Sequence, residues 1–208
     1  ARPKILLCDD YEEAWNYFWT YRENVLGIVS DVEFPKDGQK CLDAGIQFAE
    51  RVRELMPDVP VVLQSGKQEN EELARKVGRA FLRKGSPTLL KDLRGFMLKN
   101  FGFGDFVFRT PDGEEVGRAH DLKSLEKELR TVPVESVAYH AEHNHFSVWL
   151  KAHTEFAIAH QLRPQKLSDF DSAKDLRNNL IKAIRTHREA RRRAVVTDFN
   201  PERFNYER

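Results

Sequence analysis

The sequence predicts an α/β protein in which a parallel β-sheet covered by helices is followed by a β-hairpin and a mostly helical second region. In the first half, short apolar runs alternate with segments of helical periodicity, which is the pattern of right-handed βαβ crossovers. In the second half, alternating apolar and polar residues precede several long segments with helical spacing. The pattern changes near residue 100, so we expect two domains, 1–100 and 101–208.

Four apolar runs in the first half predict the strands of the sheet. A parallel sheet is buried on both faces, so its strands are nearly continuous hydrophobic runs. Segments with apolar residues at helical spacing separate these runs. The expected strands are residues 4–8, 25–32, 60–64 and 80–83. The expected helices are residues 11–24, 44–56, 69–77 and 86–99. The last of these helices begins at Ser86-Pro87, because serine suits the N-cap and proline suits the first helical position.

The second region begins after an FGFG segment, at residues 101–104, that interrupts the pattern. Residues 105–109 and 114–118 predict a hairpin around Pro111-Asp112-Gly113. Four helices are expected after it, at residues 122–130, 134–142, 146–161 and 173–194. The last helix has an apolar stripe, which suits packing against a partner or a second copy and predicts a homodimer through the helical C-terminal region. The stripe comprises Leu176, Leu180, Ile181 and Ile184.

Composition excludes several classes of protein. With 34 Lys and Arg residues against 33 Asp and Glu residues, the chain lacks the overall positive charge of a nucleic-acid-binding protein. No apolar run approaches the roughly 20 residues that cross a bilayer, so we expect no membrane partner. Two cysteines are too few for a disulfide framework, and the N-terminal residues show no signal-peptide pattern. A cytoplasmic protein is therefore expected.

Chemically capable side chains follow the predicted strands. Asp31 ends the second apolar run, Ser65 follows the third, and Phe81 and Lys84 lie in or just after the fourth. Because ligand chemistry in parallel sheets collects at the carboxyl ends of the strands, we expect these polar groups to meet there. A carboxylate can accept a phosphoryl group, a lysine can neutralise its oxygens, and a hydroxyl can donate to one of them.

This set of residues resembles the receiver domain of response regulators (CheY-like), the phosphoprotein module of two-component signal transduction and phosphorelays. In that family the third strand ends in the phosphorylated aspartate, the fourth ends in Ser or Thr, and the fifth carries an aromatic residue and a lysine. The resemblance implies that Asp31 is the phospho-acceptor, Ser65 the sensor hydroxyl, Lys84 the counter-ion and Phe81 the switch aromatic. It also implies a flavodoxin-like sheet, Mg²⁺ as cofactor, and a sensor histidine kinase or small phosphodonor as partner.

The chain departs from that family at its N-terminus. Too few residues separate Asp10 from Asp31 to hold the extra βα unit that the family places between its acidic metal-binding pair and its acceptor. Residues 4–8 therefore correspond to the family's second strand. The first strand is either absent or upstream of residue 1.

Asp9 and Asp10 have two interpretations. In the first, they bind Mg²⁺ together with Asp31 as a displaced acidic pair. In the second, Asp10 is the N-cap of helix 11–24, and Glu13 completes an arrangement like a capping box. A second departure is Gly85, which follows Lys84 where the family usually has proline.

The second region has fewer candidate catalytic or ligand-binding residues. A metal site at His140, Glu142, His143 and His145 is conceivable, although polar histidines at a helix end explain the pattern as well. The basic run 188–193 suits the C-terminal turn of a helix, and contact with phosphate or nucleic acid is the alternative.

Three longer segments resemble a narrower group, the regulatory N-terminal region of bacterial phosphoenolpyruvate synthase and pyruvate phosphate dikinase-like proteins. The segments are residues 28–32, 86–113 and 143–156. No catalytic motif of that group is found, so we expect a regulatory module and not an enzyme. The function predicted is a phosphorylation-dependent switch read out by residues 101–208. The alternative is a pseudo-receiver that is never phosphorylated and serves as an interaction or oligomerisation scaffold.

Overall fold

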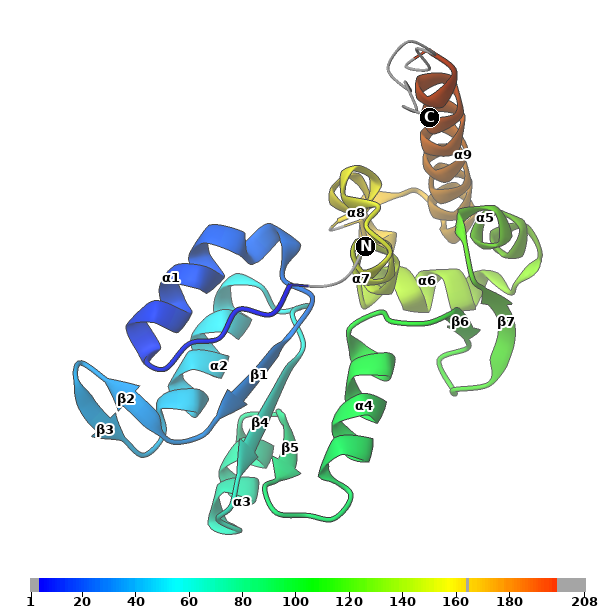
Figure 1. Cartoon of the computed structure of the whole chain (residues 1–208). Coiled ribbons are helices and arrows are strands. Elements are labelled where there is room, and N and C mark those ends of the chain that lie inside the picture. The colour runs from blue at the N-terminus through cyan, green and yellow to red at the C-terminus, as the bar shows by residue number, and fades with distance from the viewer. Residues whose placement is uncertain (1–3, 164, 198–208) are drawn as a thin grey trace, which may run out of the picture. The chain divides into compact units, whose positions relative to one another are not determined.

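The computed structural model describes residues 4–163 and 165–197, and it has the expected α/β architecture (Figure 1). The chain forms two compact units. Unit 1 comprises Ala1–Gly104 and His143–His160, and unit 2 comprises Asp105–Glu142 and Gln161–Arg208. The division into domains 1–100 and 101–208 stays a prediction about which parts fold independently.

Unit 1 is built on a three-stranded parallel sheet, which confirms the predicted α/β class with a parallel sheet. Its strands are β1 (Ile28–Asp31), β4 (Val61–Ser65) and β5 (Ala80–Arg83), in the order β1-β4-β5. Asp31 is the register partner of Gln64, and Ser65 is the register partner of Arg83. The carboxyl ends of all three strands therefore lie along one edge of the sheet.

Four helices precede, connect or follow these strands, as the periodicity predicts. They are α1 (Tyr11–Tyr21), α2 (Ala44–Leu55), α3 (Glu69–Lys76) and α4 (Leu89–Asn100), and a 3-10 turn (Arg22–Asn24) follows α1. Helix α4 begins later than predicted. Its N-cap is Thr88, while Ser86 uses its hydroxyl to accept from the Thr88 amide at 3.2 Å and so closes a turn before the helix.

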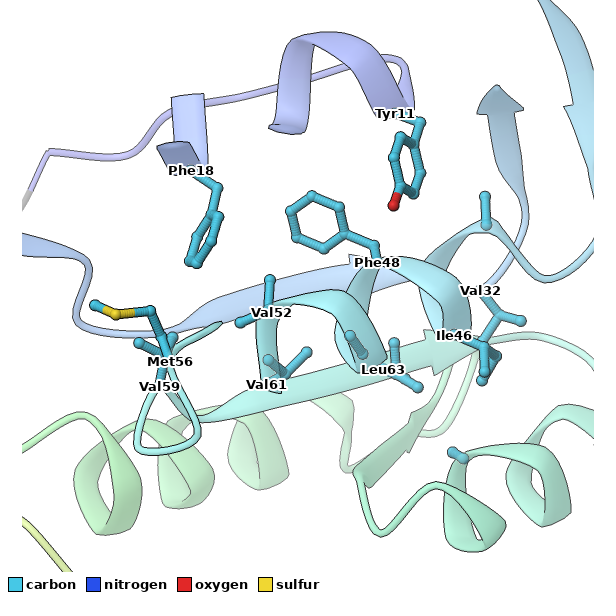
Figure 2. Close-up of a cluster of buried hydrophobic side chains, with 13 residues drawn as sticks. Tyr11, Phe18, Val32, Ile46, Phe48, Val52, Met56, Val59, Val61 and Leu63 are labelled. Carbon is cyan, nitrogen blue, oxygen red and sulfur yellow. The ribbon is translucent and has the colours of Figure 1, made fainter. Parts of the chain in front are cut away.

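Aromatic rings hold α1 against α2 and form the core of unit 1 (Figure 2). Phe48 of α2 meets the rings of Tyr11 and Phe18 edge-on, at centroid distances of 5.6 and 6.2 Å. Val61 and Leu63 of β4 belong to the same cluster, so this face of the sheet is sealed. Burial of this apolar surface is the main term that stabilises the unit.

The predicted first strand is wrong. Residues 4–8 have no regular secondary structure and pair with no strand, and Ile5 and Leu7 are 80% and 82% exposed. Within the described part of the chain, β1 pairs with β4 alone, so β1 is an edge strand and residues 4–8 do not add to its open side. An apolar run becomes a strand only where it pairs with a neighbouring strand, and periodicity does not report that.

A small hairpin after β1 was not predicted. Strands β2 (Phe34–Lys36) and β3 (Gln39–Cys41) pair antiparallel around Asp37-Gly38. Both turn residues have positive φ, 53° and 71°, which is the pattern of a type I′ turn and favours an Asp-Gly sequence. The Asp-Gly pair was therefore a usable signal.

The remaining helices of unit 1 are α7 (His145–Ala152) and α8 (Phe156–Leu162, of which residues up to His160 belong to this unit). A single helix over 146–161 was predicted, and that continuity is wrong. The chain turns at Thr154, whose φ is 64°, and the Thr154 and Glu155 amides donate back to the last turn of α7. Trp149 of α7 donates its indole N–H to the Gly104 carbonyl at 2.9 Å and so anchors the segment after α4.

Unit 2 contains the predicted hairpin and the remaining helices. The hairpin pairs β6 (Phe106–Arg109) with β7 (Glu115–Ala119), and the helices are α5 (Leu122–Thr131), α6 (Val134–Glu142) and α9 (Ala173–Thr197). A 3-10 turn (Leu167–Asp169) precedes α9. Leu176, Leu180 and Ile184 are at most 1% exposed, and α9 packs on α5 and α6. These three residues of the stripe that suggested a homodimer therefore pack within unit 2, against its own helices.

In the part of the chain that the structure describes, no helix combines the length and the apolar character needed to cross a membrane.

Candidate functional site

The site is built around an ion pair that crosses one end of the sheet. Asp31 ends β1 and Lys84 follows β5, with β4 between them. The Lys84 Nζ nevertheless donates to Asp31 Oδ2 at 2.6 Å, so the lysine reaches over the end of β4. Asp31 Oδ1 is buried and has no hydrogen-bond partner among the described residues. One carboxylate oxygen is thus neutralised, and the other keeps its capacity to accept.

Ser65 lies on the strand between these two charges. Its backbone carbonyl accepts from the Lys84 amide at 2.9 Å, and this bond positions the Lys84 backbone beside the end of β4. Its side chain is 7% exposed, and the Oγ accepts from the Lys67 amide at 3.2 Å and from Asn70 Nδ2 at 2.9 Å. Because both acceptor positions of the hydroxyl are used, its own proton is the group left to donate.

Glu33 belongs to the site, although sequence reasoning missed it. The carboxylate is mostly buried, with 15% of the side chain exposed, and lies two residues beyond Asp31. Lys67 Nζ contacts Glu33 Oε1 at 2.5 Å, Lys40 Nζ contacts Oε2 at 3.5 Å, and Asn70 Nδ2 donates to Oε1 at 3.3 Å. The usable signal was that Glu33 and Lys67 each stand two residues after the end of a strand, Asp31 and Ser65 being the last residues of the neighbouring strands β1 and β4.

The charges in this network support one another. The hydrogen bond from Lys67 lowers the pKa of Glu33, and the Lys40 charge acts in the same direction. The hydrogen bond to Glu33 raises the pKa of Lys67 in turn. Both groups are therefore held in their charged forms at neutral pH.

Phe81 lies on β5, two strands away from Asp31 on β1, with β4 between them. It is the register partner of Leu63 on β4 and packs, half-buried, against the cluster of Figure 2. It therefore lies at the margin of the core, near the end of the strand that leads to Lys84.

Asp10 is a helix cap, the second of the two interpretations given above. Its Oδ1 accepts from the Glu13 amide at 2.8 Å, and Glu13 Oε2 accepts from the Asp9 amide at 3.2 Å. No group of three His, Cys, Asp or Glu side chains among the described residues could hold a metal ion. The residues present thus do not provide the acidic pair that an Mg²⁺ site with Asp31 would require, and we assign no step to the metal.

Gly85 has a φ of +81°, where proline is excluded because its ring fixes φ near −65°. The backbone after Lys84 therefore takes a path that the proline of the receiver family could not follow.

His140, Glu142 and Arg188 make packing contacts within unit 2. His140 is 5% exposed, and its Nε2 accepts from the Arg109 amide at 2.8 Å. Glu142 accepts from the Leu167 amide at 2.9 Å. In the basic run, Arg188 forms an ion pair with Glu126. These contacts belong to the packing of unit 2.

No protein-family model matches this chain, and neither the curated proteins nor the solved structures contain a match. The functional argument therefore rests on the residues and their geometry.

Proposed function

We propose that this chain is a phosphorylation-dependent signalling module of the receiver type, in which Asp31 accepts a phosphoryl group. The observation that carries the proposal is the 2.6 Å pair between Asp31 and Lys84, formed across the end of the strand that holds Ser65. In this proposal the donor is a sensor histidine kinase or a small phosphodonor, residues 101–208 read the change out, and the protein works in the cytoplasm.

The reaction transfers a phosphoryl group to an oxygen of Asp31 from a nitrogen of a kinase histidine or from an oxygen of a small phosphodonor. A carboxylate oxygen of Asp31 attacks phosphorus and forms an O–P bond while the bond to the leaving group breaks, and that group departs with the electron pair. Lys84 offsets the charge on the phosphoryl oxygens. The Ser65 proton, which no contact in the described network uses, is suited to donate to one of those oxygens.

The first test is phosphate uptake from acetyl phosphate, measured by intact mass with and without added Mg²⁺. We expect a single phosphate on the wild-type protein and none on Asp31→Asn. Asp112→Asn is the matched control, because Asp112 lies in the β6–β7 turn of unit 2 and should leave uptake unchanged.

Lys84→Ala tests the role of the cation. We expect uptake about a hundredfold slower, because a charge that stabilises the transferring group is lost. Lys91→Ala, at an exposed position on α4, should transfer at the wild-type rate. Equal rates in both variants would contradict the assigned role of Lys84.

The second candidate is a scaffold that is never phosphorylated. It is favoured by the lack of a three-ligand acidic group among the described residues, since phosphoryl transfer to aspartate is normally assisted by a divalent cation. If the wild-type protein stays unmodified under all donor and Mg²⁺ conditions, the ion pair is structural and the protein works by binding alone.

A further inference from the structure

The Asp31 site is linked to a surface hairpin through the single carboxylate of Glu33. Glu33 contacts Lys67 after β4 at 2.5 Å and Lys40 on β3 at 3.5 Å. Asn70 divides its amide between Glu33 at 3.3 Å and Ser65 at 2.9 Å. One anion thus sets the positions of two lysines and of the amide that holds the Ser65 hydroxyl.

The hairpin continues this link as far as α1. Lys36 on β2 donates to Gln47 at 2.5 Å and lies over the ring of Tyr11 at 4.8 Å. The Asp37 amide donates to Glu12 at 3.2 Å. Because Lys40 is part of the hairpin, a change in the Glu33–Lys40 ion pair alters the hairpin directly. The hairpin in turn contacts the N-terminal turn of α1.

A phosphoryl group on Asp31 would compete with Glu33 for its cations. It carries up to about −2 charge and three acceptor oxygens, whereas Glu33 offers a single negative charge. Asp31 and Ser65 end neighbouring strands, and Glu33 and Lys67 each follow two residues later, so Lys67 is suited to exchange one anion for the other. Its side chain is half exposed, which leaves it free to swing.

We propose that Glu33 is the switch carboxylate of this site, which in the unmodified protein holds Lys67, Lys40 and Asn70, and which loses Lys67 to the phosphoryl group on Asp31. Lys67 makes the shortest contact with Glu33, at 2.5 Å, so the carboxylate can move once Lys67 leaves, and its longer contacts with Asn70 at 3.3 Å and Lys40 at 3.5 Å shift with it. This movement lets Ser65 turn toward the phosphoryl oxygens and loosens the β2–β3 hairpin. This regulation rests on the proposed phosphorylation of Asp31.

The unmodified protein tests the first half of the proposal. We expect amide exchange in residues 34–41 to be about two- to fivefold faster in Glu33→Gln than in the wild type, the range expected when a modest ion-pair network is lost. Lys67→Ala should accelerate the same amides, and Glu54→Gln on α2 should not. Urea unfolding of each variant establishes that it is folded. Wild-type exchange in both Glu33→Gln and Lys67→Ala would overturn the switch.

The phosphorylated protein tests the second half. Acetyl phosphate should accelerate exchange in residues 34–41 of the wild type, and it should add no further acceleration in Lys67→Ala. If phosphate is taken up and the hairpin stays unchanged, the switch is overturned while the proposed function stands. If no phosphate is taken up, the proposed function fails, and the switch fails with it.

Discussion

The two faces of the parallel sheet in unit 1 differ in how completely they are covered. Strand residues alternate between the faces, so Val61 and Leu63 lie on one and Val62 on the other. The first face joins the aromatic cluster of α1 and α2, and Val61 and Leu63 are at most 3% exposed (Figure 2). On the other face, Val62 is buried but its neighbour Val29 on β1 is 41% exposed.

Helix α4 adds to this difference. Helix α2 has six buried residues, whereas no residue of the fully described helix α4 is buried. Leu90 and Leu98 of α4 are 79% and 49% exposed. Truncating an apolar side chain of α2 should therefore lower the free energy of unfolding by several kcal/mol more than truncating one of α4, although the two helices are similarly apolar in sequence.

Phe48→Ala should give the largest effect. The ring is 4% exposed and contacts three other aromatic rings, so its loss removes buried area and leaves a cavity. We expect the free energy of unfolding to fall by about 3–5 kcal/mol, measured by urea denaturation. A loss below about 1 kcal/mol would mean that the α1–α2 face is not the main core.

Gly27→Ala tests a close contact between the start of the sheet and the end of α4. A Cβ at Gly27 would lie 2.0 Å from the ring of Phe101, which is 4% exposed. We expect a loss of about 1–3 kcal/mol from overpacking. Gly95→Ala in α4 meets nothing within 4 Å and should be neutral or stabilising, because alanine favours a helix. Equal stabilities for the two variants would show that Phe101 moves aside freely.

The segment after α4 is held by α7, and His145 of α7 makes this support sensitive to acid. Burial, and secondarily the neighbouring His143, lowers the pKa of His145 from 6.5 to about 4. The unfolded chain therefore binds a proton first as the pH falls, and stability should decline between about pH 6.5 and 4. We expect a decline of roughly 1–3 kcal/mol in the wild type. The decline should be smaller in His145→Gln than in His120→Gln, whose histidine is exposed.

Sequence reasoning was strongest where the local pattern decides the structure. The helices, the three parallel strands and the β6–β7 hairpin follow from periodicity and turn residues. It failed at residues 4–8, where strand formation depends on pairing with a neighbouring strand, which the segment itself does not encode. At the site, the strand-end rule brought Asp31 and Lys84 together, but Glu33 was missed because its partners come from three separate segments.

Leu90→Ser should have the smallest effect on stability. It tests whether this exposed face of α4 is open to solvent or is covered by a second copy of the chain. With 79% of the residue exposed, the change removes little buried area, and the free energy of unfolding should stay within about 0.5 kcal/mol of the wild type. The measurement is urea unfolding at two protein concentrations, together with sedimentation. A loss of 1 kcal/mol or more that grows with concentration, and a smaller sedimenting species, would mean that another copy covers Leu90. The contrast between α2 and α4 would then be a property of the single chain and not of the protein in solution, because association supplies the burial that the fold of one copy lacks.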